Sequence, residues 1–354
     1  MPRSLSPIGQ IARILLAAFV MVSAQPAAAC TRVVYHGPDG VIMTARTMDW
    51  NEDIGTNLWI LPKGIARSGE VGPNSVRWTA KYGSVIASGY DMSTTDGFNE
   101  AGLAANVLWL GASRYPRFDG SKPGLSIAAW AQYVLDNFAT VKEAVEALRA
   151  EPFVIVTDNL PGKERLTTLH LSMSDSAGDS AIIEYIDGRQ VIHHDRAHQV
   201  MTNTPVPILQ RTMDKYRQAG GKAKLPKSYR SADRFLRASA YLKDVPAQQE
   251  PAQAIESVLG VVRKVSIPLG VTTRGEPASS STRWRSVADH KRRIYLFEST
   301  RAPSGFWVDL NKIDFSVETG RVRKLDLGPN QARRQSGDAT ADFQTAEPFR
   351  FKGL

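Results

Sequence analysis

The residue best suited to chemistry is Cys30, the only cysteine in the chain. It follows Ala27–Ala29, a run of small residues of the kind that ends a secretory signal peptide. Cleavage after Ala29 would leave the Cys30 thiol beside a free α-amino group. The reference pKa of such an amine is about 7.7–8.0 and that of the thiol about 8.5, so the two groups can exchange a proton near neutral pH. A nucleophile activated by an N-terminal amine is an established arrangement for acyl transfer.

The residues before Cys30 predict how that terminus arises. Arg3 and Arg13 precede the apolar run 14–24, which falls short of the ~20 residues needed to cross a bilayer. We therefore predict a signal peptide over residues 1–29 and no stable membrane insertion after processing. A lipoprotein, with its lipid on the same cysteine, is the main alternative. Its processing usually requires a large aliphatic residue three positions earlier, where this chain has Ala27.

Composition excludes several other classes. The formal net charge of +9 comes from scattered basic residues without a nucleic-acid motif, so we expect a solvated basic surface and no nucleic-acid partner. A mild preference for anionic substrates stays open. A single cysteine excludes disulfides within the chain. His193, His194 and His198 lack the cysteine and acidic neighbours of a metal site, so we interpret them as surface histidines and predict no metal and no cofactor.

A cation and a carboxylate follow Cys30 closely. Arg46 and Asp49 lie at the end of the second predicted strand, and a hairpin would bring that end back beside residue 30. A cation there would favour the thiolate, and a carboxylate could orient the ammonium group. A surface salt bridge is the alternative for either residue taken alone.

The remaining elements must position these groups. Thr140–Glu143 has the pattern of a capping box that opens a helix. Strands come first along the chain, then helices, then strands, helices and strands again, an order that favours an α+β fold of antiparallel sheets with helices outside them. We predict one domain over residues 30–327 and a loosely packed tail over 328–354. Alternating and 3.6-residue patterns predict strands at 32–35, 41–45, 84–89, 102–110, 166–173, 180–185, 190–193, 283–287, 293–297 and 305–310, and helices at 127–138, 140–148, 231–242 and 252–262.

Several short motifs in this order resemble the choloylglycine hydrolase and penicillin V acylase family. They are Cys30-Thr-Arg, Thr44-Ala-Arg-Thr-Met-Asp-Trp50, Asp96-Gly-Phe-Asn-Glu-Ala-Gly-Leu103, Met201-Thr-Asn-Thr-Pro205, Leu225-Pro, Ser231-Ala-Asp-Arg-Phe-Leu-Arg237, Thr282-Arg-Trp-Arg-Ser-Val-Ala-Asp289 and Arg293-Ile-Tyr-Leu-Phe297. The resemblance spans about residues 30–310. It implies the four-layer αββα sandwich of N-terminal-nucleophile hydrolases.

The resemblance also implies roles for five residues. Cys30 matches the nucleophile, and Arg46 and Asp49 match the pair that holds its thiol and amine. Asn203 matches the side-chain amide that donates to the oxyanion, together with a backbone N–H near residue 109. Arg234 matches a cation near the tetrahedral intermediate. Without the family, Asn203 could equally cap a turn before a proline, and Arg234 could lie on a helix surface.

Trp109 and Trp50 are the predicted substrate-binding residues. Trp109 stands where bile-salt hydrolases tend to carry Asn and Gram-positive penicillin acylases Tyr, so the chain resembles the Gram-negative branch, and we expect it in the periplasm. An indole beside the nucleophile favours an apolar or aromatic acyl group. The stretch between Asn203 and Arg234 belongs to the assembly region in Gram-positive members. It is shorter here, so the homotetramer suggested by the family does not carry over directly.

These observations predict a hydrolase of linear N-acyl amides that works through a thioester acyl-enzyme. Penicillin V and long-chain N-acyl-homoserine lactones are the leading small-molecule substrates. Bile salts are the alternative within the family. A non-catalytic, lipid-anchored periplasmic protein is the alternative from another class, and it would have a blocked amine and thiol at Cys30.

Overall fold

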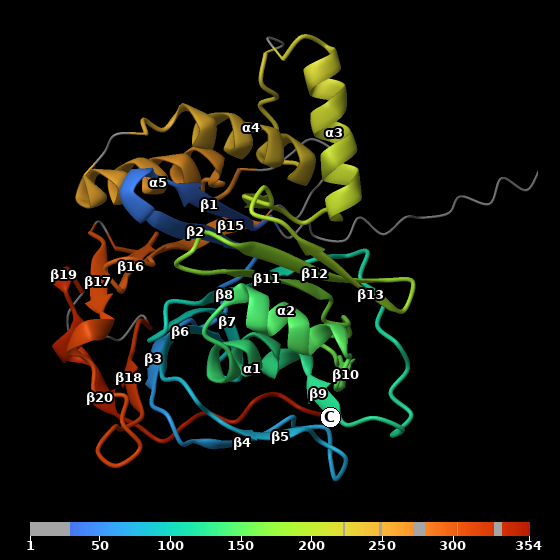
Figure 1. Ribbon diagram of the computed structural model, residues 1–354, viewed down its shortest axis with the longest axis vertical. Helices are drawn as coiled ribbons and strands as arrows, with labels where there is room; N and C mark the ends of the chain where they lie inside the picture. Colours follow the sequence, from blue (N-terminus) through green and yellow to red (C-terminus); the bar gives the residue numbers. More distant parts are fainter. Residues whose placement is uncertain (1–28, 222–223, 248–249, 272–279, 303, 329–334) are drawn as a thin grey trace, which may run out of the picture.

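Two stacked sheets with helices on both outer sides make up the protein (Figure 1). The computed structural model describes residues 29–221, 224–247, 250–271, 280–302, 304–328 and 335–354. The predicted signal peptide, except for Ala29, lies outside these residues. Within them, no helix is both long and apolar enough to span a bilayer.

The first sheet carries the start of the predicted mature chain. Its strands, in spatial order, are β14 (Val200–Met201), β1 (Thr31–His36), β2 (Ile42–Trp50), β15 (Ser281–Asp289), β16 (Ile294–Ser299), β17 (Phe306–Asp309) and β19 (Gly337–Asp338). All neighbours pair antiparallel except β17 and β19. We call this sheet A.

The second sheet, sheet B, lies beneath sheet A in Figure 1 and is antiparallel throughout. Its strands, in spatial order, are β13 (Arg189–His194), β12 (Ser180–Ile186), β11 (Leu169–Ser174), β8 (Ala104–Trp109), β7 (Ser93–Asn99), β6 (Ser84–Gly89), β3 (Leu58–Leu61), β18 (Arg323–Leu325) and β20 (Gln344–Thr345). Two small ribbons stand apart, β9 (Gly124–Ser126) with β10 (Val154–Val156) and β4 (Ala66–Ser68) with β5 (Arg77–Thr79).

Helices cover the outer faces of both sheets (Figure 1). Helices α3 (Val206–Gln218), α4 (Ser231–Asp244) and α5 (Pro251–Val265) lie on the side of sheet A, and α1 (Trp130–Asn137) and α2 (Val141–Arg149) lie under sheet B. Side chains alternate along each strand, so sheets A and B each have one face toward the other sheet and one toward the helices. One hydrophobic cluster therefore fills the space between the sheets and two others fill the space under the helices. The predicted four-layer αββα sandwich is confirmed.

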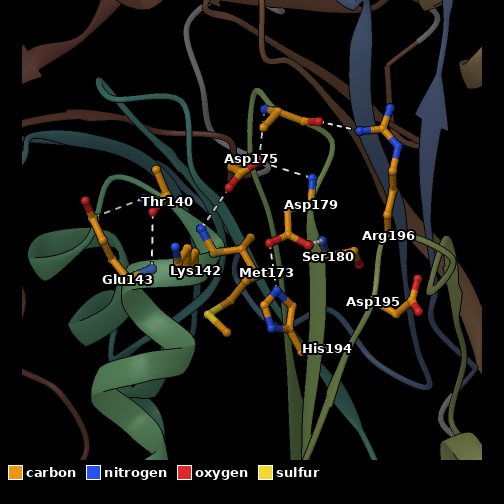
Figure 2. Close-up of polar contacts among 12 residues, drawn as sticks. Thr140, Lys142, Glu143, Met173, Asp175, Asp179, Ser180, His194, Asp195 and Arg196 are labelled. Atoms are coloured by element: carbon orange, nitrogen blue, oxygen red, sulfur yellow. Dashed lines mark hydrogen bonds and ion pairs between the residues drawn. The ribbon is translucent and has the colours of Figure 1, made fainter.

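Helix α2 is tied to sheet B by the turn between β11 and β12 (Figure 2). Thr140 and Glu143 form the predicted capping box at its start. Asp175, in the turn, accepts a hydrogen bond of 2.9 Å from the backbone N–H of Val141. A carboxylate at this place satisfies a free N–H group at the helix start and complements the helix dipole.

The hairpin of β1 and β2 positions Cys30. Thr31 pairs with Thr47 in the antiparallel register, which places Cys30 near Met48 and Asp49, as the sequence predicted. Arg32 fixes this hairpin across the inter-sheet space. Its guanidinium donates to the carbonyl oxygen of Met173 at 2.9 Å and to the hydroxyl of Ser180 at 3.1 Å, both on sheet B.

The prediction of a loosely packed tail is wrong for its described part, residues 335–354. Phe343 and Phe351 are buried, and the Phe349 ring packs edge-on against Trp59 with centroids 5.2 Å apart. The tail also adds β19 to sheet A and β20 to sheet B. The tail is polar in composition, but its aromatic side chains are buried. Their burial offsets the conformational entropy that the chain loses when it becomes ordered.

Candidate active site

Cys30 lies between the sheets and is only 3% exposed. The backbone N–H of Asp49 donates to its Sγ at 3.4 Å, and the Met48 Sδ lies 4.0 Å from the same sulfur. Burial raises the pKa of the Cys30 thiol above its ordinary value, and the positive charge of Arg46 opposes part of that shift. With Ala29 still attached, the nitrogen of Cys30 is an amide and offers no base.

Arg46 supplies a fixed, fully buried cation near the thiol. Its Nη1 donates to the carbonyl oxygens of Thr95 at 2.6 Å and Val107 at 3.1 Å, which belong to neighbouring strands of sheet B. Its guanidinium also lies over the Trp284 ring, 5.0 Å from the centroid. These contacts hold Arg46 in one place, so its charge acts on Cys30 without movement of the side chain.

Asp49 is equally buried, on the opposite face of β2. Its carboxylate accepts hydrogen bonds from the hydroxyls of Thr282 at 2.6 Å and Thr47 at 2.9 Å. Burial raises the pKa of Asp49, whereas the charge of Arg234 and these two hydroxyls oppose the shift. The contribution of Thr282, which lies on the neighbouring strand β15, was not predicted from the sequence.

Arg234 joins the separate parts of the site. From the first turn of α4, its Nη1 donates to the carbonyl oxygen of Cys30 and to the hydroxyl of Thr31, each at 2.6 Å. Its Nη2 donates to Oδ1 of Asn203 at 2.7 Å. Arg234 is 0% exposed, so the alternative of a helix-surface arginine is wrong.

Asn203 is oriented by two hydrogen bonds of opposite direction. Its Oδ1 accepts from Arg234, and its Nδ2 donates to the backbone carbonyl of Trp109 at 2.8 Å. The amide nitrogen carries two hydrogens, and the bond to Trp109 uses one of them. The structure therefore brings Cys30, Arg46, Asp49, Asn203 and Arg234 together, as the sequence predicted.

A largely apolar pocket opens beside the Cys30 sulfur and encloses about 860 Å³ of empty space, including its open mouth. Trp50 and Trp109 both line it, with ring centroids 5.4 Å apart. This volume lies within the range of small-molecule sites. The other apolar side chains of its wall are Met48, Ile54, Met92, Val107, Ile127, Ala128, Leu160, Pro161 and Leu169. A thiol beside such a pocket can receive an apolar acyl group.

The loop of residues 157–168 was not predicted to take part in the site. The Arg165 guanidinium lies over both indoles, 4.1 Å from the Trp109 ring centroid and 5.5 Å from that of Trp50. The loop is held at one side by an ion pair of 2.7 Å between Lys163 and Glu52. The only sequence signal was the charge cluster of the loop, which by itself indicates a solvated surface.

The histidines were interpreted as surface residues, and this is wrong for His193. His193 and the buried His170 both bond to the carboxylate of Glu184, at 3.2 and 3.3 Å. Although burial opposes ionisation, these bonds lower the pKa of Glu184 to about 2. Glu184 also accepts the N–H of Val206 at the start of α3, so the cluster fixes the segment that follows Asn203. Among the described residues, no group of three or more histidine, cysteine or acidic side chains is arranged to hold a metal ion.

Comparisons with known proteins agree with this site. The model of the linear amide C–N hydrolases, choloylglycine hydrolase family, matches residues 30–322. A penicillin V acylase of Pectobacterium atrosepticum is 53% identical, over 92% of this chain and 93% of its own length. The structure of a penicillin V acylase from Agrobacterium tumefaciens is 58% identical, with a TM-score of 0.86 over 92% of this chain and all of that one.

A more distant structure shares the fold. A mutant conjugated bile acid hydrolase of Clostridium perfringens superposes with a TM-score of 0.71 at 20% identity, over 86% of this chain and 99% of its own. The family model spans most of the chain and the acylase relatives are more than half identical, so the chain is a penicillin V acylase-like hydrolase of linear amide bonds. It belongs to the choloylglycine hydrolase family.

Proposed function

We propose that the mature protein begins at Cys30 and that this N-terminal cysteine hydrolyses N-acyl amides through a thioester. The observation that carries the proposal is the position of the Cys30 sulfur. It lies at an apolar pocket, while Arg234 connects the same residue to Asn203. A nucleophile, a base on the same residue and a fixed amide donor are the parts that acyl transfer from an amide requires.

In the first half of the reaction, the α-amine of Cys30 takes the thiol proton and the sulfur bonds to the substrate carbonyl carbon. The carbonyl π electrons move to oxygen and form an oxyanion. The ammonium then gives its proton to the substrate nitrogen, the C–N bond breaks, and the free amine leaves a thioester on Cys30. Arg46 favours the thiolate throughout, because its charge is fixed nearby.

We propose that two donors stabilise the oxyanion. One is the second hydrogen of the Asn203 Nδ2, which the bond to the Trp109 carbonyl does not use. The other is the backbone N–H of Trp109. In an antiparallel strand the N–H and C=O of one residue point to the same side, so this N–H faces the side on which Asn203 lies. Preorganised donors of this kind stabilise the charge that develops in the transition state.

In the second half, the same amine takes a proton from water and the resulting hydroxide bonds to the thioester carbon. The C–S bond breaks, the thiolate recovers the proton from the ammonium group, and the carboxylic acid leaves. One basic group thus serves both halves.

The aromatic pocket supports penicillin V, with its aryl acyl group, and long-chain N-acyl-homoserine lactones as substrates. A steroid conjugate would need polar contacts that the indole of Trp109 does not provide. Bile salts are therefore the third candidate. The close relatives named penicillin V acylases favour the first of these substrates.

We also propose that the exported protein is located in the periplasm. Intact-mass spectrometry and N-terminal sequencing of this protein test its maturation. We expect Cys30 as the first residue and a mass without lipid. Any other first residue would remove the base and with it the mechanism, and a lipid adduct would instead support the lipid-anchored alternative.

Substrate choice is tested with a panel of penicillin V, N-acyl-homoserine lactones and glycine-conjugated bile salts, monitoring release of the free amine. We expect the first two classes to be hydrolysed faster than the bile salts. A clear preference for bile salts would contradict our assignment of the pocket.

A further inference from the structure

The largely apolar pocket also contains one pair of opposite charges. Lys352, near the chain end, forms an ion pair with Asp158, and the two residues are 194 positions apart in the sequence. Both line the pocket that holds the Cys30 sulfur. Among the described residues that form its wall, these are the two with charged side chains. The charged side chains of this wall therefore form one ion pair, and the Arg165 guanidinium lies over the indoles of Trp109 and Trp50.

The backbone of Lys352 is fixed on both sides. Its N–H donates to the carbonyl oxygen of Met92 at 2.8 Å, and its own carbonyl accepts a hydrogen bond from the hydroxyl of Ser126. The preceding Phe351 is buried among the side chains under sheet B. The ammonium group is thus held at the pocket by the packing of the tail and not only by its ion pair.

The ion pair and the thiol belong to different parts of the fold, although both line the same pocket. Cys30 directly precedes β1 in sheet A, whereas the end of the chain lies beside β9, on the helical side of sheet B (Figure 1). The residues that bond to Lys352 are Met92, Ser126 and Asp158, and those that contact the Cys30 sulfur are Met48 and Asp49. The pocket that would receive an acyl chain from Cys30 is therefore also bounded by the ion pair.

The two charges interrupt the apolar wall of the pocket. The side chains of Lys352 and Asp158 are 29% and 42% exposed, so both are partly hydrated. A methylene group buried before this point gains up to about fourfold in binding. A methyl terminus that reaches the pair would displace water from two charges without supplying a hydrogen bond, which costs binding free energy.

We propose that the Lys352–Asp158 ion pair sets the upper length of the apolar acyl group that this enzyme accepts. The inference deepens the proposed function and rests on it. The match to the family model covers residues 30–322, so Asp158 lies inside the matched part of the chain and Lys352 lies outside it.

The test uses the processed, full-length protein and a series of saturated N-acyl-homoserine lactones that lengthens in steps of two methylenes, with penicillin V as reference. The variant carries Lys352→Met and Asp158→Leu, which replace both charges with apolar side chains of similar length. We expect kcat/KM of the wild type to stop rising with chain length. The variant should continue to rise, gaining about tenfold or more over wild type on the longest chain, relative to penicillin V.

Arg350→Met is the matched control. Arg350 also belongs to the tail and pairs with Glu70 at 2.8 Å, but neither residue lines the pocket. It should leave the chain-length profile unchanged. The single variant Lys352→Met should shift the chain-length profile in the same direction as the double variant, but by a smaller amount. It replaces the double variant in the test if the double variant does not fold. Coincident profiles of the charge-removed variants and the control would overturn the length inference. Absence of amine release by wild type from every member and from penicillin V would overturn the proposed function instead.

Discussion

The two ends of the pocket are built in opposite ways. At the thiol end, Arg46, Asp49 and Arg234 are each 0% exposed, and each takes part in at least two hydrogen bonds with other residues. At the acyl end, the wall includes residues of the 157–168 loop and Lys352 of the tail, and the charged side chains of these segments form partly exposed ion pairs such as Lys163–Glu52.

This difference separates chemistry from selectivity. Buried charges with fixed partners keep their positions, and removing one partner leaves the other uncompensated, which is costly. Exposed pairs contribute little to stability, so their charged side chains can be replaced with little cost to the fold. We therefore expect substitutions at the thiol end to lower kcat and substitutions at the acyl end to alter KM and substrate choice.

The largest expected effect is that of Cys30→Ser. Beside an amine of pKa near 8, a serine hydroxyl forms almost no alkoxide, whereas a cysteine thiol forms appreciable thiolate. We expect kcat to fall by roughly 10³-fold or more on every substrate, with an unchanged melting temperature. Steady-state kinetics and circular dichroism measure both quantities.

Iodoacetamide labelling is the companion measurement, because the chain has one thiol to count. One adduct per processed chain should abolish turnover. Slower labelling is expected while Ala29 is still attached, because burial then raises the thiol pKa and no amine is present. Activity of Cys30→Ser within a few-fold of wild type would refute the nucleophile.

Asn203→Ala should have the next largest effect. Removing one oxyanion donor typically lowers kcat by ~10²–10³-fold, and little change is expected in KM. Asn203→Asp is the matched variant, because it keeps an oxygen to accept from Arg234 but has no amide hydrogens. If Asn203 acts only by holding Arg234, Asn203→Asp will restore kcat. If it donates to the oxyanion, both variants will be slow.

The thiol end was largely predictable from sequence and the acyl end was not. Cys30, Arg46 and Asp49 lie on one hairpin, and two-residue alternation with antiparallel pairing brings them together from local pattern alone. Asn203 and Arg234 needed the family resemblance, because nothing local distinguishes them from a turn cap and a surface cation. Their burial and mutual hydrogen bond follow only from how α4 packs against β1.

Lys352 and Arg165 could not be placed before the fold was known. Their contacts join segments whose order in space depends on how the tail crosses under sheet B and how the 157–168 loop folds over the pocket. Local composition there is polar and favours an exposed loop or tail. The signal that was available is the spacing of Phe343, Phe349 and Phe351, since aromatic residues so close to a chain end need a surface on which to be buried.

Trp109→Ala is expected to have the smallest effect on catalysis of these substitutions. It is also the most direct test of the difference between the thiol end and the acyl end of the pocket. Trp109 lines the pocket, and we propose that its backbone N–H donates to the oxyanion. Truncation removes apolar surface and the ring beneath Arg165, but keeps the backbone N–H. A loss of ~1.5–3 kcal/mol of burial corresponds to about 10–100-fold in KM. The effect on kcat should be much smaller, because a contact made equally in the ground and transition states changes KM alone.

Trp307→Ala provides the control for this prediction. Trp307 lies on β17, is 38% exposed and does not line the pocket, so its loss should leave both constants near wild type. Kinetics on penicillin V and on a long-chain N-acyl-homoserine lactone should show the same pattern, since both acyl groups would contact the Trp109 indole. An unchanged KM with a collapsed kcat would show instead that the Trp109 ring supports the chemistry. The division between a rigid thiol end and an adaptable acyl end would then have to be drawn beyond Trp109, at the 157–168 loop and the tail.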